Sequence, residues 1–464
     1  MIWVALLDLV CLFIGSVLGV VMRLGPEETA TYVYLHIDGW LLLFGSVILA
    51  NYLAGSYRIQ HRFSRFNLIV TWLFSILFAC LILSITSFAW FSFMVGRGVL
   101  FLSLFFYSIM SLFFKLLICR SLFRSEALLC RTVVLGCGKE AQAMRKELEN
   151  RFVLPAHKVV AYIDLEDDKT RGTGDFSMLD GVAVVQVKRK SLEDVIRSLS
   201  VGLIVIALEG KEKPARLYPV LRRLRFEGIE VITPLNVFEI YGGRTPLDLI
   251  DENYLMQASM ESKLPGAQRI KRASDFLLAV VAFVIFLFPS LLIALAIKLC
   301  GPRLPVFYTQ PRLGRFGVPF RIVKFRTMRV DAEDETGPVW SGNDDSRITV
   351  VGRFLRRFRL DEIPQFLNIL NGDMSLVGPR PERPEIVSEL EKHIPFYSER
   401  MHVMPGMTGW AQIRYPYGNS RKDAARKLEY DLYYMKHLTF SLDLQIVLST
   451  LRIVLFGGDR KSVV

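Results

Sequence analysis

The stretch ASDFLLAVVAFVIFLFPSLLIALAIKL, residues 273–299, decides how the second half of the chain meets a membrane. It is long enough to span a bilayer, but Pro289 lies inside it, and an internal proline removes a backbone donor and kinks a helix. Both flanks are basic, which favours the cytoplasmic side at both ends. The flanking basic residues are Arg269, Lys271, Arg272, Lys298, Arg303 and Arg312. We expect a re-entrant helix that turns near Pro289, with an ordinary fifth span as the alternative.

Four further apolar stretches precede this one, and each is near the roughly 20 residues that a spanning helix needs. They are residues 2–22, 39–57, 67–91 and 98–119. Arginines gather between the second and third stretches and after the fourth, so residues 1–122 are expected to form a four-helix transmembrane bundle with both ends in the cytoplasm. Asp8 and Lys115 lie near the ends of these stretches, and we expect them to snorkel toward the interface.

The composition limits the partners. The 464 residues carry a net charge of +12, and 52% of them are hydrophobic. Basic excess beside apolar segments favours lipid headgroups and phosphates as partners. Nucleic acid is not expected, because no zinc-finger, helix-turn-helix or RNA-binding signature is present.

Residues 127–250 have a different pattern, in which short apolar strands alternate with helical segments. This pattern predicts a Rossmann-like α/β domain with a parallel sheet. Gly136-Cys137-Gly138-Lys139-Glu140-Ala141 follows the first strand and opens a helix, as a phosphate-binding fingerprint does, although alanine replaces its third glycine. Two interpretations stay open: a dinucleotide site, or an inert or oligomer-forming domain. The polar residues 251–268 are expected to form a linker.

Residues 269–464 are expected to form a mixed α/β catalytic module. Near its end, residues 430–456 interleave apolar and polar side chains at helical spacing. That spacing is typical of interfacial amphipathic helices and equally of ordinary core helices.

The densest group of charges is GRFLRRFRLDEIPQ, residues 352–365. If this segment is one helix, Arg356 lies about a turn before Asp361, and Pro364 ends the helix soon after Glu362. A carboxylate can attack phosphorus, and nearby guanidinium groups would bind phosphate oxygens. Magnesium held by the carboxylates and substrate phosphates would help in the same way. A solvated helix with surface ion pairs is the alternative.

Two further basic segments fit phosphate binding. In FRIVKFRTM, residues 320–328, strand alternation places Lys324 and Arg326 on one face. In GPRPERP, residues 378–384, prolines hold Arg380 in a stiff loop.

Four ordered strings resemble the bacterial sugar transferase family, the monotopic polyprenyl-phosphate phosphoglycosyl transferases. They are KFRTM (324–328), LDEIPQ (360–365), NGDMSLVGPRP (371–381) and PGMTGWAQ (405–412). The overall layout is similar to the large members that begin exopolysaccharide synthesis, such as undecaprenyl-phosphate glucose or galactose phosphotransferases.

The resemblance implies an enzyme of the bacterial inner membrane, with its catalytic module on the cytoplasmic face. Asp361 would attack the sugar-bearing phosphate of a UDP-sugar, expel UMP and form a covalent phosphosugar intermediate. Undecaprenyl phosphate would then take the phosphosugar. Glu362 would complete the dyad, and would orient or deprotonate the acceptor or assist magnesium. The phosphate-binding residues would be Lys324, Arg326, Arg356 and Arg380.

The sequence departs from the family pattern at three places: Pro289-Ser290 reverses the usual Ser-Pro order, Arg359 replaces Ser or Thr before the dyad, and Ile413-Arg414 replaces Asn-Gly. Two other classes of function remain. One is a membrane-anchored nucleotide-sensing scaffold with an inactive module. The other is a nucleotide-sugar epimerase or dehydratase, which would need a Tyr-x-x-x-Lys pair after a larger Rossmann unit.

Overall fold

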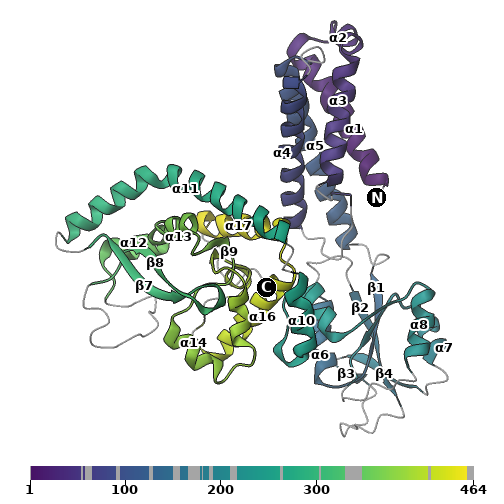
Figure 1. Ribbon diagram of the computed structural model, residues 1–464. Helices are drawn as coiled ribbons and strands as arrows, with labels where there is room; N and C mark the ends of the chain where they lie inside the picture. The colour runs from purple at the N-terminus through teal and green to yellow at the C-terminus, as the bar shows by residue number, and fades with distance from the viewer. Residues whose placement is uncertain are drawn as a thin grey trace. The chain divides into compact units, whose positions relative to one another are not determined.

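A computed structural model describes most of the chain and divides it into two compact units, Met1–Gly242 and Gly243–Val464 (Figure 1). The described residues are 2–53, 56–57, 65–89, 95–124, 129–149, 157–165, 178–179, 181–187, 192–208, 217–261, 265–301, 305–329, 347–415, 418 and 420–456.

The first unit begins with five helices: α1 (Ile2–Leu24), α2 (Thr29–Leu35), α3 (Ile37–Leu53), α4 (Arg65–Ala89) and α5 (Arg97–Arg124). Helices α1, α3, α4 and α5 correspond to the four predicted apolar stretches and share one apolar core (Figure 1). Among the described residues, α1 and α5 are each long and apolar enough to cross a membrane. Helices α2 and α3 meet at a 79° bend and reach that length only together, and the apolar part of α4 is shorter.

Asp8 and Lys115 form a buried ion pair in this helical core. Lys115 Nζ lies 2.8 Å from Asp8 Oδ2, and their side chains are 7% and 1% exposed. Ser111 Oγ donates to Asp8 Oδ1 at 2.7 Å, and Lys115 Nζ donates to Asn51 Oδ1 at 3.3 Å. The expectation of snorkelling is therefore wrong: both residues face inward, because the pair and its hydrogen bonds satisfy the charges where they are buried.

The same unit continues as an α/β domain whose sheet has the strand order β3-β4-β2-β1-β5-β6. All neighbouring strands are parallel except β3 and β4, which confirms the predicted parallel α/β sheet. The strands are β1 (Cys130–Leu135), β2 (His157–Leu165), β3 (Met178–Leu179), β4 (Val182–Val187), β5 (Leu203–Ile206) and β6 (Glu230–Ile232). The helices are α6 (Lys139–Leu148), α7 (Leu192–Ser198), α8 (Tyr218–Phe226) and α9 (Pro234–Val237).

The first glycine of the fingerprint after β1 has a packing role. Gly136 adopts φ 117°, and a Cβ there would lie 2.2 Å from the Ala207 carbonyl oxygen, just after β5. Only glycine permits that approach of the two backbones. The contact accounts for this glycine without a bound nucleotide.

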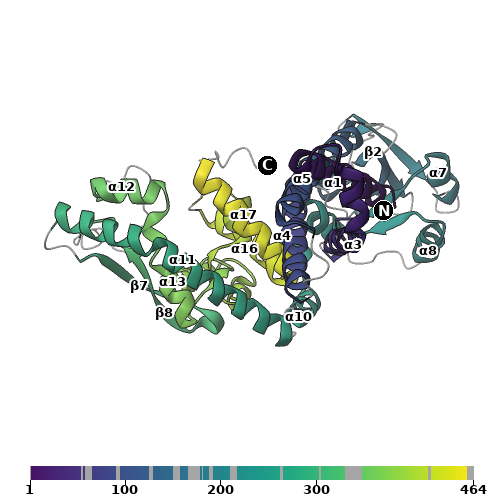
Figure 2. The same ribbon diagram turned by 90° about the horizontal axis from the view of Figure 1, so that it is seen from above.

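The second unit contains two small sheets surrounded by helices (Figures 1 and 2). Strands β7 (Phe307–Leu313) and β8 (Pro319–Phe325) form an antiparallel hairpin, and β9 (Ser375–Val377) pairs in parallel with β10 (Gly406–Thr408). The longer helices are α10 (Glu252–Glu261), α11 (Pro265–Cys300), α12 (Val350–Arg357), α14 (Pro384–Glu391), α16 (Arg421–Lys436) and α17 (Phe440–Phe456). The shorter ones are α13 (Gln365–Asn371) and α15 (Trp410–Arg414).

The segment expected to be a linker contains helix α10. Asp251 starts the helix, because its carboxylate accepts a hydrogen bond from Tyr254 N at 2.8 Å. Leu255 then packs against the apolar cluster below α16. The segment therefore contains a capped helix that buries Tyr254 and packs Leu255 against the core, while its other early residues are exposed.

Helix α11 is continuous over 36 residues and includes Pro289, so the interruption expected there is not seen. Figure 1 shows the helix as a smooth arch, a shape that lets a helix contain a proline without breaking. One side, including Ala279 and Ile297, packs on the core of the module. The other side carries a stripe of exposed apolar residues, namely Leu277, Val281, Val284, Phe288, Leu291, Leu295 and Leu299.

The first turns of α11 are fastened to the module by polar contacts. Arg272 donates to the carbonyl oxygens of Ile369 and Leu370, at the end of α13, at 2.6 and 3.1 Å. Lys271 Nζ lies 2.6 Å from Asp443 Oδ2 in α17. Two of the basic residues that flank the apolar stretch are therefore occupied inside the protein.

The first part of the C-terminal segment 430–456 consists of ordinary core helix, which was one of the two alternatives. Tyr433 and Tyr434 of α16 are buried, and Ile446 of α17 joins the same apolar cluster. Phe440 and Leu451 of α17 remain about half exposed. An interfacial role is thus restricted to one side of α17.

Candidate active site

The two carboxylates lie on a short turn between two helices. Helix α12 ends at Arg357, Arg359 adopts the left-handed conformation with φ 58°, and a 3-10 turn follows over Leu360–Glu362. The expected single helix through Asp361 is therefore wrong, because Arg359 breaks it. Pro364 does not stop a helix; it stands at the start of α13, where its missing N–H costs nothing.

Glu362 is the meeting point of three basic side chains. Its Oε1 lies 2.8 Å from Arg380 Nη2, 3.3 Å from Lys324 Nζ and 3.7 Å from Arg359 Nη1. The glutamate side chain is only 8% exposed, and burial by itself would raise its pKa. The charges of Arg380, Lys324 and Arg359 outweigh burial and hold the pKa of Glu362 well below its ordinary value. Glu362 is therefore a permanent anion.

Asp361 has the opposite environment. Burial, followed by the neighbouring Glu362 charge, raises its pKa above the ordinary aspartate value, although Lys324 and Arg356 act against this. Within the described part of the chain, no hydrogen bond or ion pair engages its carboxylate. The two adjacent carboxylates therefore have opposite pKa shifts, because cations surround Glu362 and burial dominates at Asp361.

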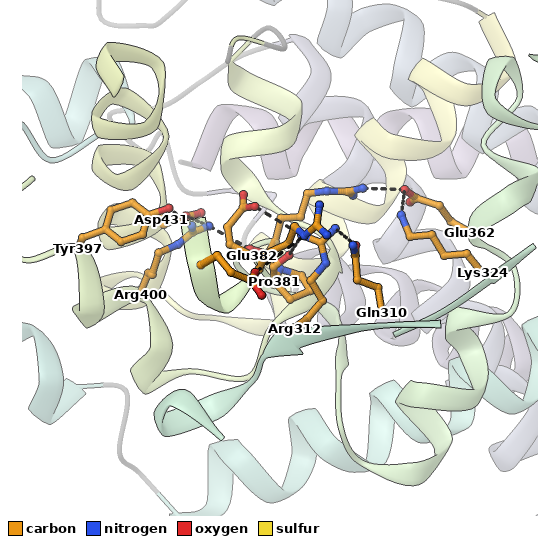
Figure 3. A network of polar contacts seen from close by, with 12 residues as sticks. Gln310, Arg312, Lys324, Glu362, Pro381, Glu382, Tyr397, Arg400 and Asp431 are labelled. Atoms are coloured by element: carbon orange, nitrogen blue, oxygen red, sulfur yellow. Dashed lines mark hydrogen bonds and ion pairs between the residues drawn. The ribbon is translucent and has the colours of Figure 1, made fainter. Parts of the chain in front are cut away.

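Lys324 and Arg326, which were predicted to share one strand face, have different surroundings. Lys324 points at Glu362, as Figure 3 shows. Arg326 lies one residue beyond the end of β8, with its guanidinium 5.6 Å from the Tyr308 ring. Its buried Nε has no hydrogen-bond partner among the residues that the structure describes. A buried guanidinium nitrogen in this state is suited to an incoming anion.

Arg356 precedes the dyad in the sequence and Arg380 follows it. Arg356 Nε donates to Thr327 Oγ1 at 2.9 Å, and its charge lowers the pKa of Asp361. Arg380 contacts Glu362 and also Gln412 Oε1, at 3.5 Å. The structure thus brings Lys324, Arg356 and Arg380 around the dyad.

The loop that carries Arg380 lies directly against β10. Gly378 N donates to Thr408 O at 2.9 Å. A Cβ on Gly406 would lie 2.0 Å from Gly378 N, and a Cβ on Gly409 would lie 2.2 Å from Gly378 O. The backbones of two strings that are distant in sequence are therefore in direct contact, and only glycine fits between them.

Arg359 and Gln412 were not predicted as site residues. Arg359 stands three residues before Glu362, so helical spacing was an available signal for it. Gln412 lies close to Arg380 because β9 pairs with β10, and no local sequence pattern predicts that pairing.

The dyad offers limited ligation for a metal. No group of three or more His, Cys, Asp or Glu side chains that would hold a metal occurs among the described residues. Asp361 and Glu362 supply two carboxylates, which fits magnesium, since this ion typically takes one or two carboxylates and completes its shell with phosphates and water.

Comparison with known proteins identifies the second unit. The sequence profile of the family described as "Bacterial sugar transferase" matches residues 266–457. The chain is 38% identical to the UDP-glucose:undecaprenyl-phosphate glucose-1-phosphate transferase of Caulobacter vibrioides, over 44% of this chain and 78% of that protein. The chain belongs to the bacterial sugar transferase family. Every predicted site residue lies inside the matched segment.

Two longer relatives are also similar to this chain. The UDP-N-acetylgalactosamine-undecaprenyl-phosphate N-acetylgalactosaminephosphotransferase of Aeromonas hydrophila is 40% identical over 51% of this chain and 55% of its own length. The UDP-glucose:undecaprenyl-phosphate glucose-1-phosphate transferase of Escherichia coli is 39% identical over 41% of each chain. The similarity therefore spans only about half of these two sugar transferases.

Proposed function

We propose that this bacterial sugar transferase moves a sugar 1-phosphate from a UDP-sugar to undecaprenyl phosphate and releases UMP. The observation that carries the proposal is the unlike pair of adjacent carboxylates. No described residue pairs with Asp361, whereas Lys324, Arg359 and Arg380 surround Glu362. The product, an undecaprenyl diphosphate sugar, would begin the membrane steps of exopolysaccharide, capsule or O-antigen synthesis.

In the first half-reaction, a carboxylate oxygen of Asp361 attacks the phosphorus that bears the sugar. The P–O bond to UMP breaks, UMP leaves with the electron pair, and the phosphosugar remains bonded to Asp361 as an acyl phosphate. Arg326 and Arg356 bind the phosphate oxygens and offset the repulsion between the anionic nucleophile and the anionic donor.

In the second half-reaction, a phosphate oxygen of undecaprenyl phosphate attacks the same phosphorus, and the Asp361 carboxylate leaves. Glu362 is too strongly ionised to serve as an efficient base, because its pKa is held far below its ordinary value. It acts by holding Lys324 and Arg380 in place for the phosphates. Magnesium, held by Asp361, Glu362 and the donor phosphates, supplies further charge compensation when bound.

The donor and acceptor follow from the relatives. Their names specify undecaprenyl phosphate as acceptor and either UDP-glucose or UDP-N-acetylgalactosamine as donor. These names differ in the sugar, so the proposal covers UDP-hexoses as a class.

We also propose that α11 enters and leaves the bacterial inner membrane on the same, cytoplasmic face, while the N-terminal helices span it. Ala279 and Ile297 are about 27 Å apart along a helix, yet both pack into one core of the module. A helix that crossed the bilayer would carry one of these residues away from a module with this many charges. The exposed apolar stripe from Leu277 to Leu299 then faces acyl chains.

Cysteine labelling tests this topology. Cys300 stands at the C-terminal end of α11, and an Ile270→Cys variant marks the other end; both positions are exposed. In sealed vesicles of one orientation, with the other cysteines changed to serine, an impermeant maleimide should reach both positions from the same side. Labelling from opposite sides would show that α11 spans the membrane.

The reaction is tested by UMP release from the detergent-solubilised full chain with magnesium, undecaprenyl phosphate and single UDP-sugars. We expect release with at least one UDP-hexose, and loss of at least about 1,000-fold in Asp361→Asn. Asp194→Asn, at an exposed position of α7, is the matched control. No release with any donor from folded protein would favour a membrane-anchored nucleotide-sensing scaffold.

A further inference from the structure

Arg400 is a buried arginine behind the loop that carries Arg380. Its Nη1 donates to the Tyr397 hydroxyl at 2.7 Å, and its Nη2 lies 2.8 Å from Asp431 Oδ2 in α16. The same Nη2 donates to the backbone carbonyl of Arg380 at 3.1 Å. Figure 3 shows Arg400 between Tyr397 and Asp431, at the opposite end of the network from Glu362 and Lys324.

Arg312, in β7, binds Pro381, the residue that follows Arg380 in the same loop. Its Nη1 donates to the Pro381 carbonyl at 3.4 Å and lies 3.7 Å from Glu382 Oε2. Its Nη2 donates to Gln310 Oε1 at 2.8 Å, which fixes the guanidinium from the other side (Figure 3). Two successive loop carbonyls therefore accept hydrogen bonds from two guanidinium groups that lie outside the loop.

The composition of the loop explains why outside donors are needed. Pro379, Pro381 and Pro384 have no backbone N–H, so the loop is poor in hydrogen bonds of its own. Buried carbonyl groups need donors, and the arginines supply them. Proline also limits φ, so once two carbonyls are held, the direction in which the Arg380 side chain leaves the loop is determined.

We infer that Arg400, supported by Asp431 and Tyr397, is a positioning residue: it holds the loop so that the Arg380 guanidinium meets Glu362. Arg400 acts through Arg380 and needs no contact with substrate. The consequence for catalysis rests on the proposed function, whereas the consequence for the loop does not.

Hydrogen exchange tests the loop without any substrate. The full chain is compared with Arg400→Lys, which keeps the charge but loses the forked geometry, and with Tyr397→Phe, which removes one hydroxyl. The peptide that contains the amides of Gly378, Arg380, Glu382 and Arg383 should exchange at least about tenfold faster in Arg400→Lys and less so in Tyr397→Phe. Arg421→Lys, whose guanidinium pairs with Glu389 on the surface, is the matched control and should leave this peptide unchanged.

A double-mutant cycle on kcat/KM for UMP release tests the link to Arg380. Arg400→Lys should lower kcat/KM by about 10- to 100-fold in the wild-type background. It should lower kcat/KM by less than about twofold in an Arg380→Lys background, because the interaction it supports is already lost.

Equal losses in both backgrounds, or unchanged exchange of the loop in Arg400→Lys, would overturn the inference. If the wild-type chain releases no UMP at all, the proposed reaction fails, and the exchange result alone decides whether Arg400 holds the loop.

Discussion

The helical core of the first unit and the dyad of the second unit both bury a carboxylate against a lysine, but they balance charge differently. In the helical core, Asp8 meets Lys115, and Ser111 and Asn51 complete the hydrogen bonds. At the dyad, two carboxylates stand among four basic side chains, Lys324, Arg356, Arg359 and Arg380. A balanced pair stabilises helix packing, whereas a surplus of two positive charges suits a site that receives anions.

Among the substitutions at these two sites, Glu362→Gln should lower the free energy of unfolding the most. It removes the buried anion that Lys324, Arg359 and Arg380 share, and we expect a loss of about 3 kcal/mol of unfolding free energy, at the low end for a buried ion pair because the three cations are partly exposed. Asp361→Asn should be neutral or slightly stabilising, because burial and the Glu362 charge outweigh the nearby cations and disfavour the charge of Asp361, and no described residue pairs with its carboxylate. Thermal unfolding of both variants in detergent measures the difference. Equal losses of stability would contradict the unlike roles of the two carboxylates.

Lys115→Met tests the balanced pair. It leaves Asp8 buried without its cation and should cost about 2 kcal/mol of unfolding free energy. The double variant Asp8→Asn/Lys115→Met should recover most of the loss. Lys146→Met, at an exposed position of α6, is the control. A double variant that is no better than Lys115→Met would argue against a specific pair.

Ser111→Ala tests how much the hydrogen bond to Asp8 contributes to the stability of the buried pair. It removes one hydrogen bond to Asp8 and keeps the ion pair, so the expected loss is about 1 kcal/mol by thermal unfolding. Ser108→Ala, which removes only a bond to the Leu104 carbonyl one turn away, is the comparison and should cost less.

The pH dependence of UMP release measures the surplus charge at the dyad directly. Asp361 must be ionised to attack, and its pKa is raised, so kcat/KM should fall with decreasing pH at a higher pH than for an ordinary aspartate. Arg356 lowers that pKa, so Arg356→Gln should move the acidic limb to higher pH. Arg357→Gln, at the exposed neighbouring arginine, should leave the limb in place. A limb that does not move in Arg356→Gln would remove Arg356 from the surroundings of Asp361.

Local patterns in the sequence predict the apolar stretches, the parallel sheet and the charged strings around the dyad. They fail where burial or distant contacts decide the outcome. Hydropathy cannot show which face of a helix Lys115 occupies, so its inward pairing with Asp8 is missed. The charge rule uses Lys271 and Arg272 only to place one end of the apolar stretch in the cytoplasm, and it does not predict that Asp443 and the end of α13 bind them.

Arg400 and Asp431 illustrate the limit for the site. They stand 31 positions apart in ordinary helical surroundings, and only the folded chain places their ion pair behind Arg380. The turn at Arg359 is missed for a related reason, since a left-handed conformation is rare for an arginine and no local residue pattern predicts it.

The contact of Gly378 with Gly406 and Gly409 has a consequence for how relatives of this protein diverge. Where two backbones touch with no side chain between them, a change in one cannot be compensated by a smaller residue in the other, because nothing is smaller than glycine. The two strings should therefore be inherited together. A chimera that takes only residues 371–381 or only residues 405–412 from a relative in which β9 and β10 are spaced differently should fail to fold. A chimera that takes both segments together should fold even where the rest of its sequence differs widely.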